Sequence, residues 1–352
     1  MEVPRAGHPP PAVFCIMVEW LELIRSDVTA QFLDPRKRLF VGYLLSASVI
    51  AVLWLCIAGR HSFIAAVRAV FDRGVWFSRS SRQDLICFVI NRVLFRWLRP
   101  VLVTQLAIAT LIFQLLHYQT MLPVGLFDGA GYWTAAISFT LFFFLFDDFT
   151  RFAVHYALHR VPALWAFHKF HHSAETLTPL TVMRTHPVEG LIFTARSALV
   201  QGVSIAVFVF LFGNQVDLLT IFGVNIFVVS FHALGSNLRH SHVSIRYPKA
   251  VERFLMSPAQ HQLHHSEAER HFDRNFGVAL SLWDWIFGSF HHSVSEKLTF
   301  GIGHETARFT RSVWSMYWLP VRDCLHRLAR QARIIPGPVR SAFPFLGQEE
   351  TR

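Results

Sequence analysis

Cysteine and charge are both scarce in this sequence, and each shortage excludes a class of protein. The 352 residues include four cysteines and no CxxC pair, so neither a disulfide framework nor a cysteine zinc site is expected. Charged residues make up 16% of the chain, against roughly 25% in an average soluble domain. The basic residues flank apolar runs instead of forming one patch, so nucleic acid is not expected as a partner.

Long uncharged apolar runs are abundant instead. Hydrophobic residues make up 53% of the chain, and a helix of about 20 apolar residues crosses a bilayer core. Buried helices of a large soluble protein are the alternative, but these runs exceed what a core of this size could cover. The expected fold class is all-α, as a multi-span helical membrane protein with a histidine-rich helical domain at the cytoplasmic face. The runs lie at residues 39–59, 101–127, 129–146, 197–216 and 218–238.

Basic residues predict how these spans are oriented. Cytoplasmic loops carry an excess of lysine and arginine, so the basic segment 60–99 is expected in the cytoplasm. The runs 101–127 and 129–146 would cross the membrane outward and back, and so would the runs 197–216 and 218–238. Residues 147–196 and all residues after 239 are therefore also expected in the cytoplasm. The run at 39–59 does not fit, because Arg36-Lys37-Arg38 precede it. Either it is a hairpin or interfacial segment, or residues 84–98 dip into the bilayer. The expected location is a bacterial inner membrane or the endoplasmic reticulum.

Histidines gather in the middle of the chain at helical spacings. Residues i, i+3 and i+4 share one face of a helix, so each cluster would present a patch of imidazole nitrogens. A single metal ion takes three or four protein ligands, and eight histidines therefore indicate two ions. All of them fall on the predicted cytoplasmic side. The clusters are His155 and His159; His168, His171 and His172; and His261, His264 and His265.

Four further histidines lie near these clusters. His186 precedes Pro187 and His240 follows the last apolar run, and both are expected to be ligands. His232 and His242 are further candidate ligands. For His232 the alternative is a packing histidine, or one that donates to a carbonyl and so supports a ligand.

Carboxylates near the clusters are candidates for orienting the ligand imidazoles. Glu189, Asp273 and Asp284 have this expected role, and the alternative is a helix cap or a salt bridge with an arginine such as Arg184. The pair Asp147-Asp148 would likewise support the first cluster or cap the helix that carries it.

These motifs resemble those of the fatty acid hydroxylase and sterol desaturase superfamily of integral-membrane di-iron enzymes. The resemblance covers residues 142–289. Its His-Ser-Asn element is matched by His240-Ser241-His242 at the first two positions only. Beyond the three clusters, it is carried by Arg184-x-His186-Pro-x-Glu189, Ser257-Pro258-x-x-His261, Asp273-x-Asn275-Phe276-Gly277 and Leu282-Trp283-Asp284-x-x-Phe287-Gly288-Ser289.

The resemblance implies an oxidoreductase of lipid biosynthesis with two iron ions. It would use O2 to hydroxylate or desaturate a sterol, fatty acyl or related lipid at an unactivated C–H bond, with no protein nucleophile or acid–base pair. No GxGxxG or cluster-binding cysteine motif is present. An external electron donor, cytochrome b-type or ferredoxin-like with its reductase, is therefore expected. The metal ligands would be His155, His159, His168, His171, His172, His186, His240, His261, His264 and His265.

Two other functions compete with this interpretation. A histidine-rich metal-binding or metal-transport protein would place its ligands within the spans near mid-bilayer. A di-haem cytochrome would carry single histidines on facing spans. Neither arrangement matches clusters that lie outside the apolar runs.

The chain divides into four expected parts. In the last part, residues 311–334 form an amphipathic helix interrupted at Pro320, lying either at the lipid headgroups or on the catalytic domain. A disordered tail is expected after it. The parts are an N-terminal segment (1–38), the first spans with a basic loop (39–141), the di-iron domain (142–290), and the C-terminal segment with its tail (291–352).

Overall fold

All regular elements in the described part of the chain are helices, which confirms the all-α class there. The computed structural model describes residues 12–98, 105–118, 122–213 and 225–334. The longer helices are α1 (Ala12–Leu33), α2 (Val41–Ile57), α5 (Arg79–Leu98), α6 (Gln105–Tyr118), α7 (Tyr132–Arg160), α8 (Pro162–His172), α9 (Pro187–Phe212) and α16 (Val313–Ile334). The shorter ones are α3 (Phe63–Val70), α4 (Arg73–Trp76), η2 (Pro179–Met183), α11 (Ile226–Ala233), η4 (Ser236–His240), α12 (Lys249–Glu252), α13 (Pro258–His264), η5 (Glu269–His271), α14 (Leu282–Phe287), η6 (Gly303–Glu305) and α15 (Thr306–Phe309).

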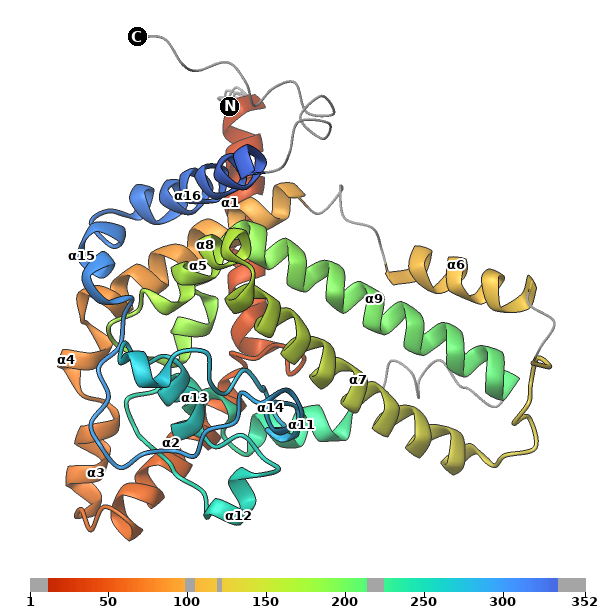
Figure 1. Ribbon diagram of the computed structural model, residues 1–352, viewed down its shortest axis with the longest axis horizontal. Coiled ribbons are helices and arrows are strands. Elements are labelled where there is room, and N and C mark those ends of the chain that lie inside the picture. The colour runs from red at the N-terminus through yellow and green to blue at the C-terminus, as the bar shows by residue number, and fades with distance from the viewer. Residues whose placement is uncertain (1–11, 99–104, 119–121, 214–224, 335–352) are drawn as a thin grey trace, which may run out of the picture.

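Three helices, α6, α7 and α9, project together from the body of the molecule (Figure 1). Helices α7 and α9 pack through a cluster of aromatic side chains that includes Phe139, Phe208 and Phe212. Helix α6 lies directly against α9, because a Cβ atom added to Gly202 would come within 2.7 Å of Ile108. The absence of a side chain at Gly202 therefore allows this close approach.

The body holds the remaining helices and two smaller cores. In one core, α2 and α3 pack against the segment that follows α11, with Ala47, Ala51 and Leu238 at its centre. The other core joins α5 and α8 to α16 through Cys87, Phe170 and Met316. The C-terminal helix is thus packed on the body, although its Trp314 side chain is 74% exposed.

Several segment boundaries differ from those expected from the sequence. Pro320 does not interrupt α16, which runs on to Ile334. Residues Asp147 and Asp148 do not cap a helix, because they lie in the middle of the unbroken α7. The expected tail after residue 334 lies outside the described residues.

The apolar runs form helices of unequal length. Within the described ranges, α9 is the one helix long and apolar enough to cross a bilayer by itself, while α2 and α6 are apolar but shorter. Of the last expected span, residues 218–224 lie outside the described residues, and the described part forms α11, which ends at Ala233. The chain then turns at Gly235, whose φ of +92° favours glycine.

Candidate metal centre

Nine of the ten expected histidine ligands converge in the body as two groups. Each histidine offers one nitrogen, and the offered nitrogens within a group all lie within 4.8 Å of one another. Site 1 comprises His155, His159, His168, His172 and His264. Site 2 comprises His171, His240, His261 and His265.

Helix geometry explains how the HxxHH clusters divide between the sites. Successive residues of a helix are about 100° apart, so residue i+4 lies roughly 40° from residue i, whereas i+3 lies roughly 60° to its other side. His168 and His172 accordingly share site 1, while His171 between them belongs to site 2. In α13 the pattern is mirrored: His261 and His265 share site 2, and His264 belongs to site 1.

In site 1 the outer ring nitrogens are fixed by protein acceptors. Nδ1 of His155 donates to the carbonyl of Phe276 at 2.8 Å, and Nδ1 of His264 donates to that of Arg274 at 2.8 Å. A carbonyl only accepts, so in these neutral rings Nδ1 carries the hydrogen and Nε2 presents a lone pair. The inner nitrogens are therefore in the form that binds a metal.

Three inner nitrogens of site 1 have no hydrogen-bond partner in the described part of the chain. Among the described residues, Nε2 of His159, His172 and His264 is buried without a hydrogen-bond partner. Buried polar atoms left unpaired are rare and need an explanation. A cation at the centre of site 1 would satisfy all of them together.

In site 2 the inner nitrogens are too close to be explained by hydrogen bonds alone. Nε2 of His240 lies 3.1 Å from Nε2 of His171 and of His261, and 3.2 Å from that of His265. One N–H group cannot serve three acceptors. Ligands about 2.1 Å from a shared ion lie roughly 3.0 to 3.4 Å apart, which matches the observed spacing.

Burial keeps these histidines neutral. It lowers the pKa of His155 to about 4 and that of His171 to about 3. Burial also holds the pKa of His159, whose neighbouring imidazoles act in the same direction, well below its usual value. Neutral imidazole is the form that binds a metal, so the folded protein presents ligands that need not lose a proton near pH 7.

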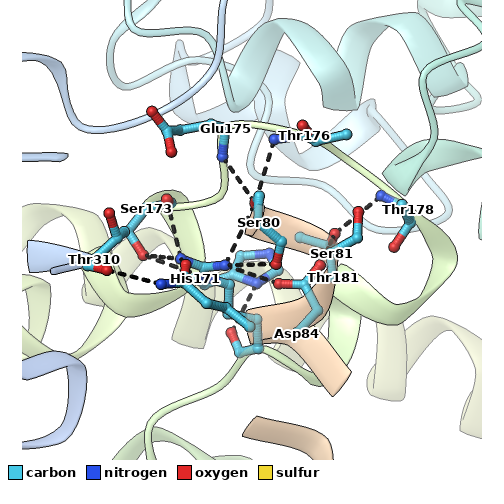
Figure 2. A network of polar contacts seen from close by, with 12 residues as sticks. Ser80, Ser81, Asp84, His171, Ser173, Glu175, Thr176, Thr178, Thr181 and Thr310 are labelled. Atoms are coloured by element: carbon cyan, nitrogen blue, oxygen red, sulfur yellow. Dashed lines mark hydrogen bonds and ion pairs between the residues drawn. The ribbon is translucent and has the colours of Figure 1, made fainter. Parts of the chain in front are cut away.

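A buried polar network holds His171 through Nδ1, the ring nitrogen that faces away from site 2 (Figure 2). Nδ1 of His171 donates to the carbonyl of Arg184 at 3.2 Å. The guanidinium of Arg184 contacts Asp84 at 2.9 Å and the hydroxyl of Ser173 at 2.9 Å, and neither Arg184 nor Asp84 is exposed. Asp84 comes from α5, far from any histidine cluster in the chain, and no sequence pattern indicated its role.

The three expected supporting carboxylates contact the sites in different ways. Glu189 lies 3.0 Å from Nδ1 of His168. Asp284 acts one step further out, because it accepts from the backbone N–H of Phe276 at 2.7 Å, whose carbonyl holds His155. Burial raises the pKa of Asp284 to about 6. An oxygen of Asp273 lies 3.8 Å from Nδ1 of His159.

The pair Asp147-Asp148 supports the site through α7. Asp148 accepts from the backbone N–H of Ala279 at 2.8 Å and from the indole of Trp283 at 3.0 Å. Asp147 pairs with Arg196 of α9 at 2.8 Å. These contacts tie the closing segment and α9 to the helix that carries the first cluster.

Three expected or candidate ligands, His186, His232 and His242, lie outside both sites. Nδ1 of His186 accepts from the backbone N–H of Val188 at 3.2 Å as the N-cap of α9. Its Nε2 donates to the carbonyl of Tyr317 at 3.1 Å, so both nitrogens are engaged. His232 contacts Ser236 at 2.8 Å, and His242 donates to the carbonyl of Ala69 at 2.8 Å.

A cavity of about 340 Å³ adjoins both sites. Members of each site form part of its wall, including His155 of site 1 and His240 of site 2. Much of the remaining wall is apolar and comes from α5, η2 and α9. These apolar residues are Phe88, Phe95, Val182, Met183 and Phe193.

Comparisons with known proteins agree with this geometry. The family model described as fatty acid hydroxylase matches residues 140–289. Human alkylglycerol monooxygenase is 27% identical over 184 residues, covering 50% of this chain and 37% of that protein. Human lathosterol oxidase is 29% identical over 175 residues, covering 49% of each. Ornithine lipid hydroxylase OlsE of Rhizobium tropici is 27% identical over 145 residues, covering 41% and 39%.

The chain thus spans half or less of the length of these relatives, and no solved structure gives a significant match. The matched segment contains all nine histidines of the two sites. Eight of them belong to the three clusters, and His240 lies between the second and third clusters in the sequence. Residues 140–289 match the fatty acid hydroxylase family model, and this match together with the relatives supports a resemblance of this segment to the fatty acid hydroxylase and sterol desaturase superfamily.

Proposed function

We propose that this protein is an O2-dependent di-iron oxidoreductase that hydroxylates or desaturates a lipid at an unactivated C–H bond. The observation that carries the proposal is the convergence of nine neutral imidazoles as two sites beside a partly apolar cavity. When bound, two irons would activate O2 with electrons from an external donor, which is the chemistry that attack on such a bond requires.

The ligand set suits iron better than structural zinc. Structural zinc is almost always four-coordinate, whereas site 1 offers five histidines. Zinc also has no redox chemistry, while imidazole ligands suit iron as well. The protein's own contribution would be to hold the ions, to fix the imidazoles through Glu189 and the backbone carbonyls, and to shelter the lipid from water.

Exposed apolar faces support a membrane location. On α2, Leu45, Val49, Leu53 and Ile57 follow at four-residue intervals, and each is more than 50% exposed. Helix α11 packs on both α2 and α7, which links this stripe to the projecting helices. On α7, Trp133 is 73% exposed. We propose an integral membrane protein that spans the bilayer more than once, with both sites at its cytoplasmic face.

The lipid would reach the cavity from the bilayer, and electrons would come from a separate cytochrome b-type or ferredoxin-like donor with its reductase. Residues 142–290 would form the di-iron domain, which the N-terminal spans anchor and α16 braces. A transporter is disfavoured, because the site histidines are buried and those on α7 lie near the C-terminal end of that helix instead of at its middle.

Metal content and lipid turnover test the proposal together. The purified protein should hold about two irons per chain and convert a lipid only with O2 and a reductant. His264→Ala should weaken metal binding at site 1 and His171→Ala should weaken it at site 2, and each should abolish turnover while membrane insertion persists. Stoichiometric zinc or haem, or turnover near wild type in both variants, would overturn it.

A further inference from the structure

Two arginines on the cavity wall lack an acidic partner. Arg38 donates to Asn237 and to the carbonyl of Ser236 at 3.3 to 3.4 Å, and its guanidinium lies 3.4 Å from Nδ1 of His240. Arg239 is 3% exposed and donates to the carbonyls of Ser236 and Val278. Neither guanidinium forms an ion pair with a described carboxylate, although buried charges are usually paired.

The nearby carboxylates are already engaged elsewhere. Asp148, whose charge acts on Arg239, accepts hydrogen bonds from Ala279, Leu280 and Trp283. Asp147 pairs with Arg151, a third arginine of the cavity wall, at 2.7 Å. The wall thus carries positive charge that the described side chains do not neutralise.

The metal sites add to this imbalance. Their nine ligands are neutral imidazoles, so two divalent cations would bring positive charge that the ligands do not offset. Glu189 is the one carboxylate in direct hydrogen-bond contact with a ligand among the described residues. A cavity of this charge favours a ligand that brings an anionic group with it.

We propose that the cavity binds the anionic end of its lipid, a carboxylate or a phosphate, between Arg38 and Arg239. Both groups accept the paired hydrogen bonds that a guanidinium donates. The inference rests on the proposed function, because it names the class of substrate that the same site takes. The lipid chain would lie along the apolar wall formed by Phe88, Phe95 and Phe193.

This placement also predicts where the lipid is oxidised. Arg38 contacts His240, so an oxyanion held by Arg38 lies beside site 2. The carbons next to the polar end are then nearest to the metal ions. Oxidation is expected close to the headgroup rather than at the far end of the chain.

Binding to metal-free protein in detergent provides the test, because it needs no turnover. The probes are lauric acid and its methyl ester, and lauroyl lysophosphatidic acid and monolaurin. Wild type should bind at least one anionic probe 10-fold or more tightly than its neutral partner. Arg38→Gln should reduce that preference about 10-fold to 100-fold and leave the neutral probes unchanged. The preferred anionic probe identifies carboxylate or phosphate as the group recognised.

Arg36→Gln is the matched control, since Arg36 lies two residues away, has a 77% exposed side chain and pairs with Asp34. It should bind all probes as wild type does. If Arg38→Gln unfolds, a competition experiment on wild type takes its place. Acetate and inorganic phosphate should then displace the anionic probes.

Equal binding of anionic and neutral probes by wild type, or the same preference in Arg38→Gln and Arg36→Gln, would overturn the inference. Turnover of a neutral lipid without any preference for anions would sink this inference alone. If the protein as purified contains no iron but still binds anionic probes selectively, the inference about the arginines stands and the proposed function is wrong.

Discussion

The carbonyl oxygen of Arg184 lies 3.2 Å from Nδ1 of His171, so the position of this arginine's backbone sets the orientation of a ligand. Its guanidinium is in turn held by Asp84 on α5. Site 2 is thereby coupled to a helix that provides no ligand.

Asp84→Asn should therefore damage both stability and site 2. Removing one partner of a buried ion pair leaves the other charge uncompensated, which costs about 3 to 5 kcal/mol. The carbonyl of Arg184 would shift with its side chain, and iron content should fall below two per chain. Thermal unfolding and metal analysis check this.

Asp34→Asn is the control for Asp84→Asn, because the Asp34–Arg36 pair is at the surface. Its unfolding temperature and iron content should equal those of wild type. A wild-type unfolding temperature in Asp84→Asn would contradict the role of the buried pair.

Glu189→Ala should weaken metal binding at site 1. Glu189 lies 3.0 Å from Nδ1 of His168, and losing such a supporting contact typically reduces metal affinity about 10-fold to 100-fold. Glu189→Gln retains an oxygen acceptor and should lose less. Metal titration of the stripped protein measures the difference, with exposed Glu175→Ala as the control. Equal affinities in all three variants would show that Glu189 does not act on His168.

His186→Ala should retain both metals and lose stability. The substitution removes the N-cap of α9 and the hydrogen bond to Tyr317 of α16. Each contribution is about 1 kcal/mol, so the free energy of unfolding should fall by about 2 kcal/mol. Urea unfolding and metal analysis separate this outcome from that of His171→Ala. A loss of one iron per chain in His186→Ala would instead show that His186 is a ligand.

Acid should destabilise the metal-free protein. Burial lowers the pKa of His155 to about 4 and of His171 to about 3, whereas both would have a pKa of about 6.5 when unfolded. Below pH 6.5 the unfolded chain binds more protons, so stability falls as pH falls towards 4 and is fully present above 7. Each such histidine costs about 1.4 kcal/mol per pH unit in that window.

Urea unfolding of metal-free protein at pH 7.5 and pH 5 checks this direction. The midpoint should be lower at pH 5. An unchanged or higher midpoint would mean that these imidazoles are solvated in the metal-free fold.

Local spacing made most of the metal centre predictable. Residues i and i+4 share a helix face, so pairs such as His155 and His159 had to point together once α7 formed. His240 was found by its position after an apolar run. The sequence did not reveal the division of each HxxHH cluster between sites, because that depends on how α8 and α13 face each other.

Tertiary contacts decide what local pattern leaves open. His186 lies between two histidine clusters in the sequence, yet Pro187 starts a helix directly after it and makes it an N-cap. For Asp147 and Asp148 both support of the first cluster and helix capping were open, and their contacts with Arg196, Ala279 and Trp283 are those of supporting residues inside a continuous helix. Contacts of this kind, distant in sequence, are not visible in hydropathy.

The acceptors that orient three of the ligands belong to the main chain. His155, His171 and His264 donate to the backbones of Phe276, Arg184 and Arg274. Exchanging one of these side chains cannot delete the oxygen, whereas inserting or deleting a residue in those loops would displace it. Related sequences could therefore differ in side chain at these three acceptor positions, while the length of the loops that carry them would have to be kept.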